Sequence, residues 1–121
     1  MKNVLVIDDS RTTADTLVRI LKALGYPARA AYGSSAGMSI LREEAPDLVF
    51  VDINMPGVSG FEILRFMGRE PRLARVPVFV VTSDDQPETR RESFQLGARG
   101  FLVKPVSVDA LDEALQGLQG K

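Results

Sequence analysis

The sequence contains no cysteine and no histidine. The lack of cysteine excludes disulfides, thiolate metal sites and cysteine nucleophiles, and it fits a reducing compartment. The lack of histidine removes the commonest general base and the commonest zinc ligand, and the chain cannot carry a phosphohistidine of its own. Any chemistry must therefore use carboxylates, hydroxyl groups, lysine or arginine.

Long apolar runs and an excess of one charge are also missing. The N-terminal segment MKNVLVIDD has one lysine, but its apolar run ends at Asp8 and is too short for the core of a signal peptide. With 15 basic and 16 acidic residues, the net charge of −1 supplies no general field for holding nucleic acid or an anionic membrane. We therefore expect a cytoplasmic protein that binds neither nucleic acid nor membranes directly.

The rest of the composition is typical of a globular protein. The chain has 121 residues, of which 45% are hydrophobic and 26% charged, enough for one domain with one core. Apolar runs alternate with amphipathic stretches along residues 1–121, which predicts a single doubly wound α/β domain with a parallel sheet. The five expected strands cover the ranges 3–7, 28–32, 48–51, 77–81 and 100–103.

Five helices are expected to alternate with these strands. The first covers residues 11–24 and is followed by Gly25 in the position of a C-terminal cap. The last covers residues 107–119, where Ser107 is the expected N-cap of an apolar stripe that starts at Val108. We assign this stripe to the core rather than to a partner groove.

The fourth helix, over residues 86–96, differs from the others. Its segment QPETRRESFQLG offers mainly Phe94 and Leu96 for burial. A helix with so few apolar residues should pack loosely, and loosely packed elements are the ones that can move. We therefore expect this helix to be free to move.

Polar residues follow four of the five expected strands. All strands of a parallel sheet end at one edge, and ligands of open α/β sheets bind outside that edge. Residues that directly follow the strands should therefore be neighbours. These residues are Asp8 and Asp9, Asp52, Thr82 and Ser83, and Lys104 with Pro105.

Taken singly, several of these residues have an ordinary structural explanation. Asp9 or Ser10 could cap the first helix, because both are favoured capping residues. Thr82, Ser83 or Asp84 could cap the fourth helix for the same reason. Single residues therefore leave a purely structural interpretation open.

The three aspartates together are harder to explain in this way. Helix capping does not require carboxylates to converge, and two carboxylates about 4 Å apart repel each other by roughly 4 kcal/mol at an effective dielectric constant near 20. Such a cluster requires a cation, and oxygen-only ligands suit Mg²⁺. Lys104 alone could be a solvated loop lysine, but with Mg²⁺ it balances the three negative charges. A metal, a lysine, a hydroxyl and a spare carboxylate are the parts needed for phosphoryl transfer onto that carboxylate.

Four segments carry a resemblance to a known family. They are VIDDS, VDINMPGVSG, VVTS and FLVKP, and both their residues and their spacing resemble the receiver (response regulator) domain of bacterial two-component signal transduction, in the CheY-like superfamily. The resemblance covers essentially the whole chain. It implies a flavodoxin-like (βα)5 fold with strand order 2-1-3-4-5. It also implies a signalling domain that is not a conventional enzyme and catalyses only its own phosphorylation and dephosphorylation.

The same resemblance implies a phosphoacceptor and a metal site. Asp52 corresponds to the phosphoacceptor. Asp9 would bind Mg²⁺ directly, and Asp8 would act mainly through a metal-bound water. Asp52 and the backbone carbonyl of Asn54 would supply further ligands. Mn²⁺ could substitute for Mg²⁺.

The resemblance further implies a phosphoryl-binding pair and a switch. Lys104 would pair with the phosphoryl group and Thr82 would donate a hydrogen bond to it. Phe101 corresponds to an aromatic residue that turns inward when the hydroxyl moves, so Thr82 and Phe101 form the expected switch. Asn54 and Asp84 match positions that influence the lifetime of the acyl phosphate. The peptide bond between Lys104 and Pro105 would be cis.

The implied partners are proteins. The phosphoryl donor would be a sensor histidine kinase or a histidine phosphotransfer protein. The output would be a downstream protein target, or an output domain outside this chain, that reads the face made by the fourth helix, fifth strand and fifth helix. The family's DNA-binding dimers have acidic residues near LGARGF and basic residues in the last helix, whereas this chain has Arg99 and Gly100 in the first region and Asp109, Asp112 and Glu113 in the second. We therefore expect a monomer or a weak dimer.

Three other interpretations fit part of the sequence. A flavodoxin-like FMN binder would share the fold, but the SRTTADT segment lacks glycine and follows two aspartates that would repel a phosphate. A hydrolase of the haloacid dehalogenase type requires an aspartate where Asn54 stands. A receiver that is no longer phosphorylated would act as a fixed interaction module, although every expected site residue is present.

Overall fold

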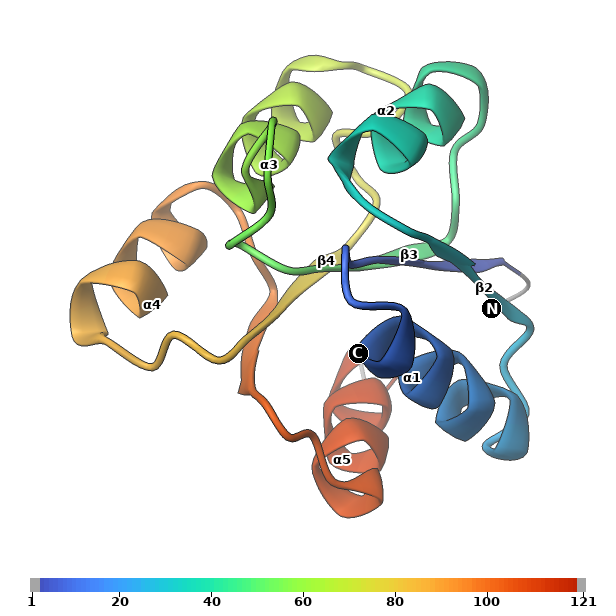
Figure 1. The fold of residues 1–121 in the computed structure, drawn as a ribbon. Helices are drawn as coiled ribbons and strands as arrows, with labels where there is room; N and C mark the ends of the chain where they lie inside the picture. Colours follow the sequence, from blue (N-terminus) through green and yellow to red (C-terminus); the bar gives the residue numbers. More distant parts are fainter. Residues whose placement is uncertain (1–2, 120–121) are drawn as a thin grey trace.

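The computed structural model describes residues 3–119, in which five strands and five helices alternate (Figure 1). The strands are β1 (Val4–Ile7), β2 (Ala28–Ala31), β3 (Leu48–Val51), β4 (Val78–Thr82) and β5 (Gly100–Val103). The helices are α1 (Arg11–Ala23), α2 (Ser34–Glu43), α3 (Gly60–Arg69), α4 (Pro87–Gln95) and α5 (Val108–Gln119). None of the helices within residues 3–119 has the length and apolar character needed to span a membrane.

The five strands form one parallel sheet in the order β2-β1-β3-β4-β5. Helices α1 and α5 cover one face of this sheet, and α2, α3 and α4 cover the other (Figure 1). The expected flavodoxin-like fold is therefore confirmed. Every strand, and each of the three helices placed from the sequence, lies within one residue of its expected bounds.

A hydrophobic core lies on each face of the sheet. Successive side chains of a strand point to opposite faces, so Val49 and Val51 of β3 join the core beneath α2 and α3. Leu48 and Phe50 of the same strand join the core beneath α1 and α5. The Phe50 ring packs edge-on against Phe79 of β4, with ring centroids 5.4 Å apart. Because both faces of β3 are covered, its carboxyl end is a rigid place for a functional side chain.

Two expectations about the last helices are wrong in detail. Phe94 of α4 does not bury its ring, since it is 41% exposed, and Ser93 is the residue of α4 that lies against the sheet. Ser93 can occupy an apolar site because its hydroxyl donates to Thr89 O, 2.8 Å away. In α5, Val108 is 50% exposed, so the buried stripe starts one turn later, at Leu111.

The helix caps agree with the sequence at α1 and α5 but not at α4. Ser10 accepts a hydrogen bond from Thr13 N, and Ser107 accepts one from Ala110 N. The N-cap of α4 is Gln86, whose side chain forms no capping bond, so the capping explanation offered for Thr82, Ser83 and Asp84 does not apply. Pro87 occupies the first turn of α4, where a missing N–H has no cost, and the helix begins within one residue of its expected start.

Candidate functional site

The acidic residues meet because their strands pair in register. Ile7 of β1 lies beside Val51 of β3, so the next residues, Asp8 and Asp52, emerge side by side at the carboxyl edge of the sheet. Carboxylate oxygens of Asp8, Asp9 and Asp52 all lie within 4.8 Å of one another. Asp8 and Asp52 are only 1% and 5% exposed, whereas Asp9 faces solvent. The three aspartates predicted from the sequence therefore form one cluster.

Lys104, which directly follows the edge strand β5, completes this cluster. Its Nζ lies 2.9 Å from Asp8 Oδ2 and 2.9 Å from Asp52 Oδ2. The backbone sets this approach, since Lys104 N donates to Thr82 O at the end of β4. The peptide bond between Lys104 and Pro105 is cis. One ammonium group thus bridges two buried carboxylates.

Burial and charge act on these groups in opposite directions. Burial is the largest influence on Asp8 and raises its pKa, although hydrogen bonds from Lys104 and Ser10 N lower it. Burial is also the largest single influence on Lys104 and lowers its pKa, but the hydrogen bonds and charges of Asp52 and Asp8 together outweigh it and raise the pKa. Lys104 therefore stays protonated. One positive charge still leaves an acidic cluster that attracts a further cation.

Asp52 is held by the loop that follows β3. Its Oδ1 accepts a hydrogen bond from Asn54 N, 3.2 Å away, and Gly60 N donates to Ile53 O, 3.0 Å away. A Cβ at Gly60 would lie 2.3 Å from Asp52 O, so α3 can only approach this closely because it begins with glycine. Sequence reasoning missed Gly60, and the only signal for it was the glycine that ends VDINMPGVSG.

The bonds of Thr82 and Asp84 run toward α4. Thr82 is fully buried, and its Oγ1 accepts a hydrogen bond from Asp84 N, 3.3 Å away. The Asp84 carboxylate accepts from Gln86 N at 3.1 Å and from Thr89 Oγ1 at 2.8 Å. These bonds link the end of β4 to the first turn of α4.

Phe101, the other expected switch residue, lies on β5 opposite Val80 of β4. Its ring is half-buried and packs against the core beneath α3. The guanidinium carbon of Arg90 lies 5.6 Å from the centre of this ring and 5.3 Å from the centre of the Phe94 ring. Phe101 is thus in contact with α4, as Thr82 is through Asp84.

The cluster can hold a divalent cation through oxygen atoms alone. Mg²⁺ and Mn²⁺ prefer carboxylate oxygens as ligands, whereas softer metals prefer thiolate or imidazole ligands. A cleft of about 460 Å³ opens beside Lys104, between the start of α1 and the β5–α5 loop, and Thr12, Thr16 and Pro105 contribute to its walls. The carboxyl edge of the sheet therefore combines three clustered carboxylates, the ammonium group of Lys104 and an adjacent cleft.

Comparison with known proteins supports the expected family. A family model described as "Response regulator receiver domain" matches residues 4–116. Protein PilH of Pseudomonas aeruginosa is 34% identical over 111 residues, which cover 92% of each chain. The gliding motility regulatory protein of Myxococcus xanthus is 32% identical over 116 residues, but these are 95% of this chain and only 15% of that protein.

Solved structures share the fold across nearly the whole chain. The chemotaxis response regulator CheY4 of Vibrio cholerae aligns with a TM-score of 0.89 and 28% identity, covering 98% of each chain. The signal receiver domain of a DNA-binding response regulator from Colwellia psychrerythraea aligns with a TM-score of 0.91 and 25% identity, covering 100% of each chain. With the family model matched over residues 4–116, these likenesses show that the chain belongs to the response regulator receiver domain family.

Proposed function

We propose that the chain accepts a phosphoryl group on Asp52, in a reaction that requires Mg²⁺, from a phosphohistidine on a partner protein. The observation that carries this proposal is the position of Lys104 Nζ, 2.9 Å from both Asp8 Oδ2 and Asp52 Oδ2. A partly buried ammonium group next to the nucleophile supports the proposal because it can neutralise phosphoryl oxygens during transfer. The donor histidine lies outside residues 1–121, since this sequence contains none.

The oxygen donors of the site fit Mg²⁺, and Mn²⁺ could replace it. Asp9 would bind the metal directly, and Asp8 would act mainly through a metal-bound water. The carboxylate of Asp52 and the backbone carbonyl of Asn54 would supply further ligands. When bound, the metal supplies positive charge that offsets the carboxylates and the phosphoryl oxygens.

In the proposed step, a carboxylate oxygen of Asp52 attacks phosphorus in line with the bond to the donor histidine. An O–P bond forms, the P–N bond breaks, and the ring nitrogen keeps the electron pair. The imidazole leaves as a neutral group when its other nitrogen carries a proton. Lys104 and the hydroxyl of Thr82 then donate hydrogen bonds to the phosphoryl oxygens.

The phosphoryl group would change the face made by α4, β5 and α5. Shifting a two-state equilibrium from 1:99 to 99:1 takes about 5.5 kcal/mol. Hydrogen bonds from Thr82 and Lys104 to a charged group, at roughly 1.5–3 kcal/mol each, can supply most or all of that energy. Phe101 would turn inward as Thr82 moves, and since its ring has no polar atom, partners would read the change through packing.

Two further residues are proposed to set how long the acyl phosphate survives. Asn54 lies two residues after Asp52, and Asp84 lies two residues after Thr82. The contacts of Asp84 with Gln86 and Thr89 support a role at this position, because they fix the loop beside the phosphoryl site.

Both the phosphoryl donor and the downstream target are proposed to be proteins. A sensor histidine kinase or a histidine phosphotransfer protein would supply the phosphoryl group. A downstream protein, or an output domain on the same polypeptide, would read the result. We place this activity in the cytoplasm and assign residues 1–121 to one receiver domain that acts as a monomer or weak dimer. The overlap with protein PilH, over 92% of each chain, supports the assignment to one domain.

Incubation with acetyl phosphate and Mg²⁺, followed by intact-mass measurement, tests the proposal. The wild type should gain one labile phosphoryl group, and this gain should vanish in Asp52→Asn or when EDTA removes the metal. Asp85→Asn, which changes an exposed aspartate of the β4–α4 loop, is the matched control and should react as the wild type does. An unmodified wild type would refute the proposal and favour a fixed interaction module, and flavin absorbance in the purified protein would favour an FMN binder.

A further inference from the structure

Ser34 is a buried polar residue that lies outside the acidic cluster. It is the first residue of α2 and is only 6% exposed. Its hydroxyl donates a hydrogen bond to Pro56 O, 3.1 Å away, and accepts one from Val58 N, 3.2 Å away. Both partners belong to the β3–α3 loop, so one side chain of α2 satisfies two backbone groups of a different segment.

The hydroxyl of Ser34 does not serve its own helix. The N-cap of α2 is Gly33, which has no side chain and therefore forms no side-chain capping bond. Serine at a helix start commonly bonds to the helix N–H groups, whereas here the hydroxyl is used by the loop. Helix capping is therefore not the reason for a serine at this position.

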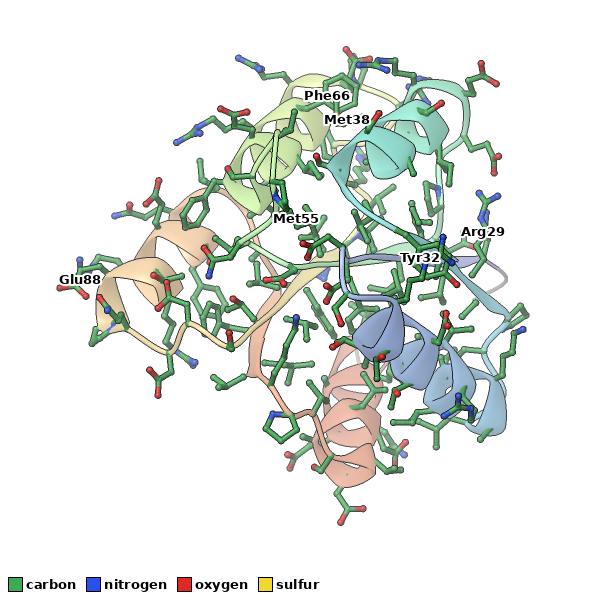
Figure 2. All side chains as sticks on the ribbon, in the orientation of Figure 1. Arg29, Tyr32, Met38, Met55, Phe66 and Glu88 are labelled. Atoms are coloured by element: carbon green, nitrogen blue, oxygen red, sulfur yellow. The ribbon has the colours of Figure 1, made fainter. Side chains whose placement is uncertain are left out.

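The β3–α3 loop is folded around this hydroxyl. Gly57, between the two bonded residues, has φ +82°, and a Cβ there would lie 3.3 Å from Ser34 Oγ. Gly57 has a left-handed conformation, and the residues on either side of it both bond to Ser34 Oγ. Together these features define the backbone path of the loop. Figure 2 shows Met55 in the same loop, and this side chain is 8% exposed and joins the core.

This loop is continuous with the candidate site. Asn54 N donates to Asp52 Oδ1, 3.2 Å away, so the start of the loop orients the acidic side chain. The end of the loop is held by Gly60 N, which donates to Ile53 O at 3.0 Å. Ser34 holds the middle of the loop, between these two fixed ends.

We propose that Ser34 is a positioning residue for metal binding: its hydroxyl fixes the loop that orients Asp52 and presents the carbonyl of Asn54. This inference rests on the proposed function. Mg²⁺ demands near-ideal octahedral geometry with short bonds, so a small displacement of a carbonyl ligand weakens binding. Loss of the hydroxyl removes the hydrogen-bond partner of both Pro56 O and Val58 N, so this part-buried stretch of the loop is no longer held on one path.

The effect should be partial because two of the carboxylates do not depend on the loop. Asp8 and Asp9 follow β1, and Lys104 holds Asp8 independently of α2. Residues that support metal ligands from outside typically change metal affinity by about 10- to 100-fold. We therefore expect the Mg²⁺ dissociation constant of Ser34→Ala to rise by about 10-fold, at the low end of this range.

The test measures Mg²⁺ binding directly on the purified full chain, by calorimetry, together with urea unfolding in the absence of metal. Ser34→Thr keeps the hydroxyl and should bind Mg²⁺ nearly as the wild type does. Ser35→Ala changes the exposed neighbour in the same helical turn and should have no effect. If Ser34→Ala fails to fold, Ser34→Cys takes its place, since a thiol fills the space but bonds weakly, and its affinity should fall as well.

Each outcome supports or overturns the role of Ser34. Weaker Mg²⁺ binding in Ser34→Ala, restored in Ser34→Thr, supports it. Reduced stability with unchanged Mg²⁺ affinity would show a purely structural serine, and equal weakening in Ser34→Thr would show that the hydroxyl is not the cause. Failure of the wild type to bind Mg²⁺ would refute the proposed function and this inference together, whereas failure confined to Ser34 would leave the proposed function intact.

Discussion

Helices α1 and α4 each begin a few residues after a site residue, but they are held to the sheet in different ways. Helix α1 follows Asp9 and buries Ala14, Leu17 and Leu21 completely or nearly so. Helix α4 follows Thr82 and buries only a serine. Apolar burial therefore fixes α1 against the core, whereas α4 is held mainly by hydrogen bonds, an ion pair and cation–π contacts.

The contacts that hold α4 are individually weak. The carboxylate of Glu92 pairs with Arg65 of α3 at 3.3 Å, but both side chains are nearly half exposed. Exposed ion pairs of this kind contribute about 0–1 kcal/mol. Glu88 points away from the sheet at the outer end of α4 (Figure 2). Elements with few buried apolar contacts open locally at low free energy, so α4 can move while the core beneath α1 stays packed.

The largest expected difference is between matched truncations in the two helices. Leu17→Ala removes a side chain that is 3% exposed and should lower the free energy of unfolding by about 2–5 kcal/mol. Phe94→Ala removes a ring that is 41% exposed and should cost less than about 1 kcal/mol, although the ring is larger. Urea unfolding monitored by circular dichroism measures both. Equal losses would contradict the view that α4 is weakly held.

Two glycines of α3 test how tightly this helix packs on the strand that carries Asp52. Gly60→Ala places a Cβ 2.3 Å from Asp52 O and should lower the free energy of unfolding by about 1–3 kcal/mol. Gly68→Ala, near the other end of the helix, meets no atom within 4 Å and should raise stability by about 0.5–1 kcal/mol.

Phosphorylation by acetyl phosphate separates the two glycine variants further. Gly60→Ala must displace the backbone that carries Asp52, so its rate should fall, while that of Gly68→Ala should not change. Opposite signs in stability together with a rate loss confined to Gly60→Ala would confirm that α3 is packed directly on the acceptor strand. A neutral Gly60→Ala would show that this segment gives way easily.

The rigid part of the molecule was the part that the sequence predicted well. Apolar runs such as Leu48–Val51 identify strands covered on both faces, and parallel strands bring their following residues to one edge. The meeting of Asp8, Asp52 and Lys104 needed no information beyond this order. Topology alone therefore predicted most of the candidate site.

Contacts that depend on the exact path of a loop were not predictable. Ser34 and Val58 lie 24 residues apart, and no local pattern indicates that a helix-start serine bonds to a loop. Phe94 was expected to be buried, but the face of α4 toward the sheet is occupied by Ser93, whose hydroxyl is satisfied within the helix. Hydrophobicity indicates which residues favour burial, and it cannot determine which side of a short polar helix faces the sheet.

The Asp84 contacts offer a more selective way to loosen α4. Asp84→Ala removes the acceptor of Gln86 N and Thr89 Oγ1, and such bonds contribute about 1 kcal/mol each or slightly less. Loss of both bonds, about 1.4–2 kcal/mol together, should therefore speed up amide exchange in α4 about 10- to 30-fold, since 1.4 kcal/mol corresponds to a factor of ten. Exchange in α1 should not change. Asp85→Ala is the matched control, and faster exchange in α1 as well would indicate general destabilisation rather than release of α4.

The smallest effect concerns the arginine shared by two aromatic rings. Arg90 on α4 lies over both Phe94 and Phe101, and its contact with Phe101 connects the helix to β5. An exposed cation–π contact contributes about 0.5–1 kcal/mol, so a double-mutant cycle of Arg90→Gln and Phe101→Leu should show a coupling of roughly 0.5 kcal/mol in the opening of α4, measured by amide exchange. Arg91→Gln, the exposed neighbour, should show no coupling.

If phosphorylation turns Phe101 inward, the ring leaves the guanidinium group of Arg90, and the coupling should disappear when acetyl phosphate and Mg²⁺ are present. A coupling that persists in the phosphorylated protein would show that Phe101 stays against α4 and that the switch uses another route.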